Sequence, residues 1–280
     1  MKKSVLLWII AFIITLILAG FQRVTGPTYP ASGTVDFLKK KIDYHFDRSH
    51  SGKGDHLVEV DVKSSDLSGK LFWKRYKTND VWNVIKMVNE NGILKASLPH
   101  QPQAGKLVYK VVLSANNSNI TIPEKKPVVI RFKGAVPLYF LIPHIFCMFF
   151  AMLLSTRTGL EIFNDKPSYK KFTFWTLAFL FFGGIILGPI AQYYAFGEFW
   201  TGIPFGIDLT DNKTLIAFVG WLVAAYAVYK FPNPKKWILF ASVLLLAVYL
   251  IPHSTLGSEL NYNKLDKQKI NIEHQTDQQK

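Results

Sequence analysis

Five long apolar runs divide the sequence, and a polar segment of about 110 residues separates the first run from the second. Most of these runs approach the roughly 20 residues that an α-helix needs to cross the hydrocarbon core of a membrane. In chain order the runs cover residues 4–21, 135–155, 172–191, 214–229 and 237–253. The pattern predicts an integral membrane protein with five transmembrane helices, the last four forming a bundle over residues 135–253.

The first run has two interpretations, because Lys2 and Lys3 followed by apolar residues are also typical of a cleavable signal peptide. We favour an uncleaved anchor over residues 1–22. The run is longer than the apolar core of a normal signal peptide, and residues 18–22 make a poor cleavage site.

Basic residues in the short loops predict the orientation, because such loops are retained on the cytoplasmic side of a membrane. They occur at the N-terminus, after the second run and after the fourth, whereas residues 192–212 contain none. The basic residues are Lys2, Lys3, Arg157, Lys166, Lys170, Lys171, Lys230, Lys235 and Lys236. We therefore expect a cytoplasmic N-terminus, with residues 23–134 and the polar tail 254–280 outside the cytoplasm.

Within residues 23–134 the pattern has the period of two that is typical of β-strands. Val58, Val60 and Val62 alternate with Glu59 and Asp61, and residues 107–113 and 128–132 repeat the pattern. Turn-forming residues separate about seven such segments. The segment is predicted to be an antiparallel β-sandwich of the immunoglobulin or fibronectin type III kind, which makes the chain an α+β membrane protein.

The net charge of +14 is concentrated in the polar segment, because residues 21–133 contain 19 basic and 10 acidic side chains. A basic surface near a membrane attracts anionic headgroups and acidic polymers, although excess lysine can also be a solvated surface. Nucleic acid is not an expected partner outside the cell. The only cysteine, Cys147, lies in the second apolar run, which excludes a disulfide and a cysteine-based metal site.

Residues 192–213 are too apolar for a loop in water and too polar for a transmembrane helix. Aromatic residues such as Trp200 and Phe205 predict a segment that lies in the membrane–water interface on the outer side of the membrane. Its charged residues are Glu198, Asp208, Asp211 and Lys213. Two interpretations of these residues are possible. They could bind a cation or a polar headgroup, or act as general acid and base. We favour the simpler interpretation, in which Asp208 or Asp211 caps the fourth helix and pairs with Lys213.

Histidines offer two further candidate sites. His144 and His253 each follow Leu-Ile-Pro and could be ligands of haem or a metal, but at about 1.5 Å per residue they lie at different depths. In the polar segment, His45, His50 and His56 have ligand chemistry without the spacing of a known metal motif. We expect packing and polar connections at these positions, and no cofactor.

Small residues in the third run predict close helix packing. Gly184 and Gly188 are four positions apart, which lets a neighbouring helix approach closely. The tail 254–280 has four basic and four acidic residues, and we expect an uncommitted extension that is disordered beyond about Asp266.

Parts of the chain resemble uncharacterised bacterial inner-membrane proteins with an extracytoplasmic immunoglobulin or fibronectin III-like domain. The residues that prompt the comparison are 105–109, 129–134, 199–202 and 208–214. The resemblance implies a location in the bacterial inner membrane and no known activity.

We expect a non-enzymatic membrane protein whose sandwich binds or assembles other envelope components. Its expected partners are membrane lipids and other inner-membrane or envelope proteins. The alternative is a membrane enzyme or small transporter that uses the 192–213 carboxylates on a lipid-linked or ionic substrate. A redox subunit that uses His144 or His253 comes third.

Overall fold

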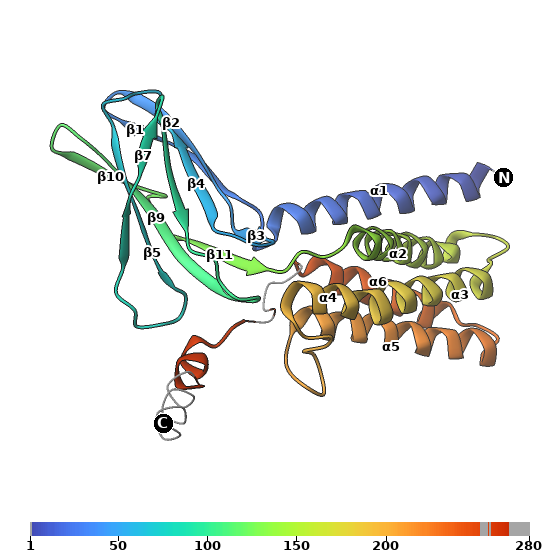
Figure 1. Ribbon diagram of the computed structural model, residues 1–280. Coiled ribbons are helices and arrows are strands. Elements are labelled where there is room, and N and C mark those ends of the chain that lie inside the picture. The colour runs from blue at the N-terminus through green and yellow to red at the C-terminus, as the bar shows by residue number, and fades with distance from the viewer. Residues whose placement is uncertain (1, 253–256, 258, 269–280) are drawn as a thin grey trace, which may run out of the picture. The chain divides into compact units, whose positions relative to one another are not determined.

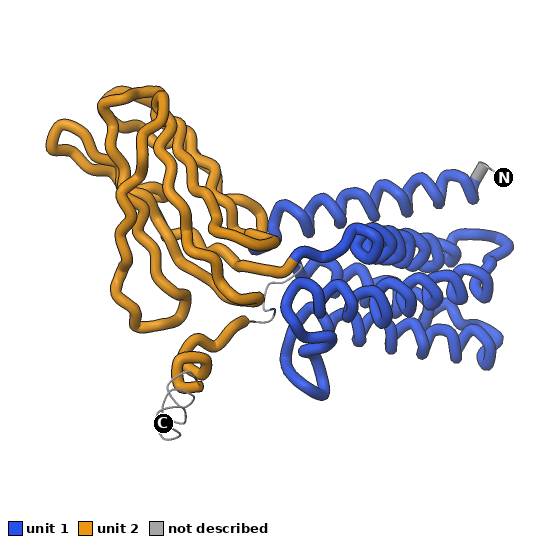
Figure 2. The backbone as a smooth tube through the Cα atoms, in the orientation of Figure 1, with its two compact units in different colours: residues 1–27, 135–258 blue, residues 28–134, 259–280 orange. Residues whose placement is uncertain are grey.

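The protein divides into two compact units in the computed structural model, which describes residues 2–252, 257 and 259–268. Figure 2 colours them separately: one contains residues 1–27 and 135–258, and the other residues 28–134 and 259–280. The first unit is helical. The second is built of β-strands together with a short C-terminal segment.

Within the described residues, the helical unit contains four helices that are long and apolar enough to cross a membrane, which fits a membrane protein. They cover Lys3–Thr25, Leu138–Phe163, Tyr169–Phe196 and Leu209–Lys230. The elements are α1 (Lys2–Thr25), α2 (Leu138–Gly159) with the 3-10 turn η1 (Leu160–Phe163), α3 (Tyr169–Leu180), the π-helical turn η2 (Phe181–Leu187), α4 (Gly188–Phe196), α5 (Leu209–Lys230) and α6 (Lys235–Leu250). The fifth predicted run forms α6, whose 16 residues are fewer than the roughly 20 of a typical span.

Figure 1 shows α2, α3, α5 and α6 side by side, and their facing side chains form one apolar core. Trp221 of α5 is fully buried in this core with Ala151 of α2 and Leu245 of α6. Apolar side chains elsewhere on the helices, such as Phe146 and Phe240, are more than half exposed. Helices that are apolar both inside the bundle and on its surface suit a lipid environment.

The second unit contains eleven strands within the described residues, in three sheets. Two strands form β1-β2, six form β3-β11-β9-β5-β6 with β10 beside β9, and three form β4-β8-β7. The strands are β1 (Ala31–Phe37), β2 (Lys40–Phe46), β3 (Ser49–Ser51), β4 (His56–Asp61), β5 (Ser68–Arg75), β6 (Asn83–Lys86), β7 (Val88–Glu90), β8 (Ile93–Leu98), β9 (Lys106–Ala115), β10 (Ser118–Ile122) and β11 (Val128–Lys133).

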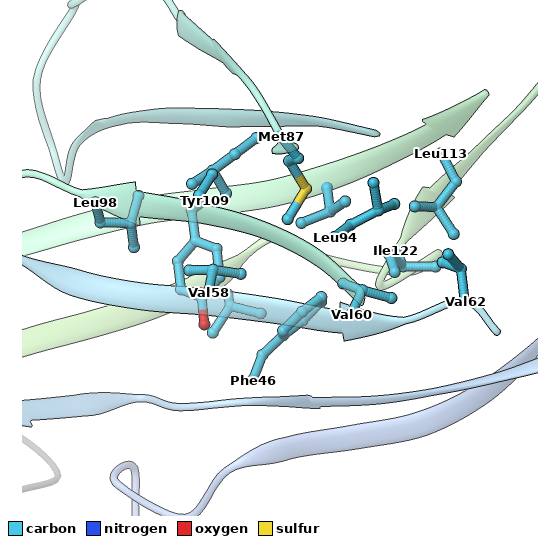
Figure 3. Packing of buried hydrophobic residues seen from close by; sticks show 14 of the residues in the cluster. Phe46, Val58, Val60, Val62, Met87, Leu94, Leu98, Tyr109, Leu113 and Ile122 are labelled. Carbon is cyan, nitrogen blue, oxygen red and sulfur yellow. The ribbon is translucent and has the colours of Figure 1, made fainter. Parts of the chain in front are cut away.

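The alternating residues of the longer strands form the core of this unit. Val58 and Val60 of β4 pack with Tyr109 and Leu113 of β9, and each is at most 2% exposed (Figure 3). Burying a valine or leucine side chain contributes about 1.5–3 kcal/mol. A shift of one residue in the pairing would turn these side chains to the solvent, so the alternation fixes the register.

Two features of the sheets differ from the prediction. About seven strands were expected, but the described residues contain eleven, and residues 82–88 are divided at Met87 between β6 and β7. Met87 is buried and its N–H donates to Gly69 O at 2.9 Å, so the chain passes there from one sheet to another. The pairing is antiparallel except between β3 and β11, which run parallel because a long excursion separates them.

Candidate functional site

The loop between α4 and α5 folds onto the carboxylate of Asp211, which is only 5% exposed. Asp211 Oδ2 accepts the backbone N–H of Thr201 at 2.7 Å and that of Gly202 at 3.0 Å. The side-chain amide of Gln192 donates to the same oxygen at 3.0 Å. Hydrogen bonds to an ionised acceptor are stronger than neutral ones. Asp211 therefore holds the loop in its conformation.

Asp208 and Lys213 fix the two helix ends beside this loop. Asp208 is the N-cap of α5: its Oδ1 accepts the Thr210 N–H at 2.8 Å, and its Oδ2 accepts the Thr201 hydroxyl at 3.2 Å. Lys213 is buried, and its Nζ donates to Ile251 O, beyond the end of α6, at 2.8 Å. This geometry favours a cap at Asp208 over a catalytic role, but the expected ion pair with Lys213 is not among those of the described residues, since Lys213 donates to Ile251 O instead.

The structure does not bring every predicted residue of this loop into one site. Thr201 joins Asp208 and Asp211, but Glu198 is exposed. Phe205 is 81% exposed at the loop tip, and Trp200 donates its indole N–H to Ile203 O at 3.0 Å. Insertion of these rings into a membrane interface stays a prediction. His253 lies outside the described residues.

His144 connects α2 to the π-helical turn. Its Nδ1 donates to Gly183 O at 2.9 Å, and the ring is partly buried. A π-helical turn interrupts the regular ladder of an α-helix and is frequent at functional sites. This hydrogen bond gives His144 a packing role between two helices.

Within the third apolar run, other helices approach closely at Gly183 and Gly184. A Cβ atom on Gly183 would lie 2.7 Å from Cys147 Cβ, and one on Gly184 would lie 2.6 Å from Thr214 Cγ2. At Gly188 the nearest atom would be 3.4 Å away, which is an ordinary contact. Gly184 therefore has the packing role predicted for it, whereas the second close approach is at Gly183 rather than Gly188.

Three histidines meet at one end of the β-sandwich, and His100 was not foreseen among them. His50 Nδ1 and His56 Nδ1 are 3.4 Å apart. His50 Nε2 and His100 Nδ1 both donate to Gly54 O, at 3.1 and 2.9 Å. Because His50 Nε2 carries a proton for that bond, neutral His50 has a bare Nδ1 that accepts the N–H of His56. The cluster therefore connects the β3–β4 loop to β8 and its following residues.

His45 is separate from this cluster and exposed on β2, where its Nδ1 contacts Ser32 Oγ at 2.9 Å. Across residues 2–252, 257 and 259–268, no three His, Cys, Asp or Glu side chains are grouped in a way that could hold a metal ion. The hydrogen bonds of His50 and His56 give these two histidines a connecting role between the β3–β4 loop and the strands beside it.

The charges of the sandwich are segregated between its sheets. The six-stranded sheet contains eight Lys and Arg in its strands and no Asp or Glu, a net charge of +8. The strands of the other two sheets contain three basic and five acidic residues, a net charge of −2. Nothing in β-sheet formation requires this separation, because both signs occur readily on solvent-facing positions. We call the outward side of β5, β6 and β9 the basic sheet face.

The register places lysines next to apolar and aromatic side chains on the basic sheet face. Its outward residues are Lys70, Phe72 and Lys74 of β5, Val84 and Lys86 of β6, and Val108, Lys110 and Val112 of β9. The Nζ atoms of Lys74 and Lys110 lie 5.5 and 5.2 Å from the ring centroid of Trp82. Among the ion pairs of the described chain, none involves Lys70, Lys74, Lys86 or Lys110.

Residues 259–268 return to the sandwich at the end of this face, where the sequence suggested an uncommitted tail. Glu259 pairs with Lys77 at 3.0 Å and with Lys106 at 2.5 Å, and Leu260 N–H donates to Ala104 O at 3.1 Å. Burial raises the pKa of Glu259, but hydrogen bonds from Lys106 and Lys77 outweigh it and leave that pKa below its ordinary value. The disorder expected beyond about Asp266 concerns mainly residues 269–280, which lie outside the described residues.

The sequence contained a signal for the basic sheet face, namely that residues 68–75, 83–86 and 106–115 lack any acidic residue. It contained none for the roles of Gln192, Thr201 or His100, which depend on contacts between distant segments. Comparison of the chain with models of protein families, with curated proteins and with solved structures found no match, so its function has to be inferred from its own residues.

Proposed function

We propose that this chain is an integral membrane protein whose extracytoplasmic β-sandwich binds and assembles other envelope components, and that it recognises them through the basic sheet face. The observation that carries the proposal is the charge separation between the sheets, +8 against −2. A surface of one sign, with apolar and aromatic groups between its charges, is complementary to an anionic partner and also offers it contact area. The function is one of binding rather than catalysis.

Lysines of the basic sheet face repel one another, and an anionic partner would remove this repulsion. Lys70 and Lys86 are direct partners across β5 and β6, and both are exposed. Like charges placed opposite each other in a sheet destabilise it, by about 0.2–1 kcal/mol for a typical pair. An anionic group between the two lysines would turn this repulsion into attraction.

The C-terminal segment supports a topology with five spans and a cytoplasmic N-terminus. In the sequence the sandwich follows α1 and precedes α2. The three spans α2, α3–α4 and α5 therefore leave the end of α5 on the side of the membrane opposite to the sandwich. Only residues 251–258 separate α6 from Glu259, which packs on the sandwich. These eight residues are too few for a helix that crosses the hydrocarbon core, which needs about 20. The short helix α6 therefore has to make the return crossing, with Lys230, Lys235 and Lys236 in the cytoplasm.

Cross-linking and purification from native membranes tests the proposal. Lys70→Ser, Lys86→Ser and Lys110→Ser are combined in a face variant, and Lys40→Ser, Lys41→Ser and Lys53→Ser in a control variant that removes the same charge from exposed sites elsewhere. We expect the wild type and the control to yield the same cross-linked assemblies at low salt, and the face variant to lose them. A monomer without cross-linked partners in all three preparations would contradict the proposal.

A further inference from the structure

The chain places two of its own carboxylates on cations at the end of the basic sheet face. Glu259 bridges Lys77 and Lys106, and Asp266 accepts a hydrogen bond from Arg75 Nη1 at 2.9 Å. The segment of residues 259–268, to which both carboxylates belong, also contains Lys264 and Lys267, and these two lysines are exposed. The segment is therefore amphipathic in charge, with its acids toward the sandwich and its lysines away from it.

Aromatic and apolar contacts accompany these ion pairs. Tyr262 is 5% exposed, and the guanidinium of Arg75 lies 5.1 Å from its ring centroid. The Tyr262 hydroxyl donates to Gln101 Oε1 at 3.0 Å and lies 3.2 Å from Lys106 O. The segment thus binds by a combination of carboxylates and an aromatic anchor, which is typical of protein–protein recognition.

Lys106, which residues 259–268 bind through Glu259, is close in the sheet to other lysines of the basic sheet face. Lys106, Val108 and Lys110 are alternate residues of β9 and point to the same side of the sheet. Lys74 pairs in register with Val108, directly between the two lysines. A ligand that extends along β9 from Lys110 would therefore reach Lys106 and meet Glu259 there.

The apolar part of the face favours a polypeptide over a purely ionic polymer. Val84 is 52% exposed between Lys86 and Trp82, and Val108 and Val112 are partly exposed on β9. Valine side chains offer nothing to a phosphate or sugar acid but bury area against leucine or tyrosine. At one end of the sheet the chain already places the aromatic ring of Tyr262 against a cation, the guanidinium of Arg75.

We propose that the basic sheet face binds a carboxylate-rich, aromatic-containing segment of a partner protein, and that residues 259–268 are an internal ligand which competes with that segment at Lys106. This inference rests on the proposed function and names the partner class of the same surface. The internal segment limits binding to partners whose carboxylates reach further along β9 than Glu259 does.

Binding of a glutamate–tyrosine copolymer to the full chain in nanodiscs of zwitterionic lipid tests the inference. Glu259→Gln with Asp266→Asn weakens the internal ligand, and Glu59→Gln with Glu90→Gln makes the same charge change on exposed strands of another sheet. We expect the first pair to tighten copolymer binding about two- to tenfold, because it weakens three partly exposed ion pairs, and the second pair to change it little. Adding the Lys70, Lys86 and Lys110 substitutions should abolish the gain.

Each other outcome has a defined meaning. Equal tightening by both pairs of substitutions would show a general charge effect and overturn the competition. Binding of polyphosphate or phosphatidylglycerol vesicles, but not of the copolymer, would overturn the polypeptide partner while leaving the proposed function intact. Self-association measured by light scattering, and lost in the face variant, would replace the partner by a second copy. If no anionic probe binds and native cross-links are absent, the proposed function itself fails.

Discussion

Arg157 and Glu161 form an ion pair one turn apart at the end of α2, and both side chains are at most 1% exposed. The guanidinium lies between two rings, 5.3 Å from the centroid of Trp8 and 5.1 Å from that of Phe172, and its Nη2 donates to Ser4 Oγ at 3.2 Å. Glu161 Oε2 accepts the backbone N–H of Ser168 at 2.6 Å. The pair therefore joins α1, α2 and α3 through one buried charge cluster.

Replacement of Arg157 by alanine should destabilise the helical unit by about 3–5 kcal/mol, because it leaves the Glu161 charge buried without its partner. Thermal unfolding of the detergent-solubilised protein measures the change. Lys3→Ala is the matched control, since Lys3 pairs with Asp165 at 3.0 Å but both side chains are at least half exposed. An exposed pair contributes about 0–1 kcal/mol, so equal losses in the two variants would contradict the structural role of Arg157.

Asp211→Ala should loosen the α4–α5 loop and lower the free energy of unfolding by about 2 kcal/mol or more. The substitution leaves the N–H groups of Thr201 and Gly202 without their acceptor. Unfolding curves, together with proteolysis of the loop, report both effects. Glu198→Ala should leave stability within about 0.5 kcal/mol of the wild type, because Glu198 is exposed. Loss of a membrane activity in the Asp211 variant at full stability would instead revive a catalytic role.

The sandwich should lose stability as the pH falls below about 6.5, the ordinary pKa of histidine. Burial lowers the pKa of His56, the Asp47 charge opposes this, and His50 adds to it. Below pH 6.5 the unfolded chain takes up a proton that the folded chain resists, so the free energy of unfolding decreases until the folded-state pKa is passed. His56→Gln should flatten the pH dependence of thermal unfolding between about pH 7.5 and 5. His45→Gln, at an exposed position, should leave the slope unchanged, and a wild-type slope in the His56 variant would refute the assignment.

Glu259→Gln should release residues 259–268 from the sandwich. Its lowered pKa means that the docking energy is present above the ordinary carboxyl pKa, about 4.5, and is lost as the pH falls through the lower folded-state value. Hydrogen exchange of the Leu260 amide, which donates to Ala104 O, measures the release. At neutral pH the variant should show the loss of protection that the wild type shows only in acid. Glu90→Gln serves as the control, and protection that survives in the Glu259 variant would count against the ion pairs.

The sequence predicts those parts of the fold that depend on neighbouring residues. Val58, Val60 and Val62 are buried as their alternation indicates, because a strand turns successive side chains to opposite faces. The apolar runs likewise form the helices. The assignment to an immunoglobulin or fibronectin III-like fold is finer than the strand pattern can support and stays a prediction.

Contacts between distant segments are beyond a local pattern. Lys106 and Glu259 are 153 positions apart, and nothing near either residue indicates the other. Arg157 and Glu161 have the spacing of a helical ion pair in the sequence, but their burial depends on Trp8 and Phe172 from two other helices. The same holds for Asp211, whose partners come from α4 and from the loop between α4 and α5.

A ribosome synthesises the chain from its N-terminus to its C-terminus. The sandwich is therefore made long before Glu259 and Tyr262, which pack on it. Every strand of the sandwich is synthesised before α2 begins, whereas these two residues follow α6. During synthesis Lys77 and Lys106 therefore stay without their internal carboxylate until the whole helical bundle has left the ribosome. Closure of the segment on the sandwich marks, within one molecule, that α6 has been made.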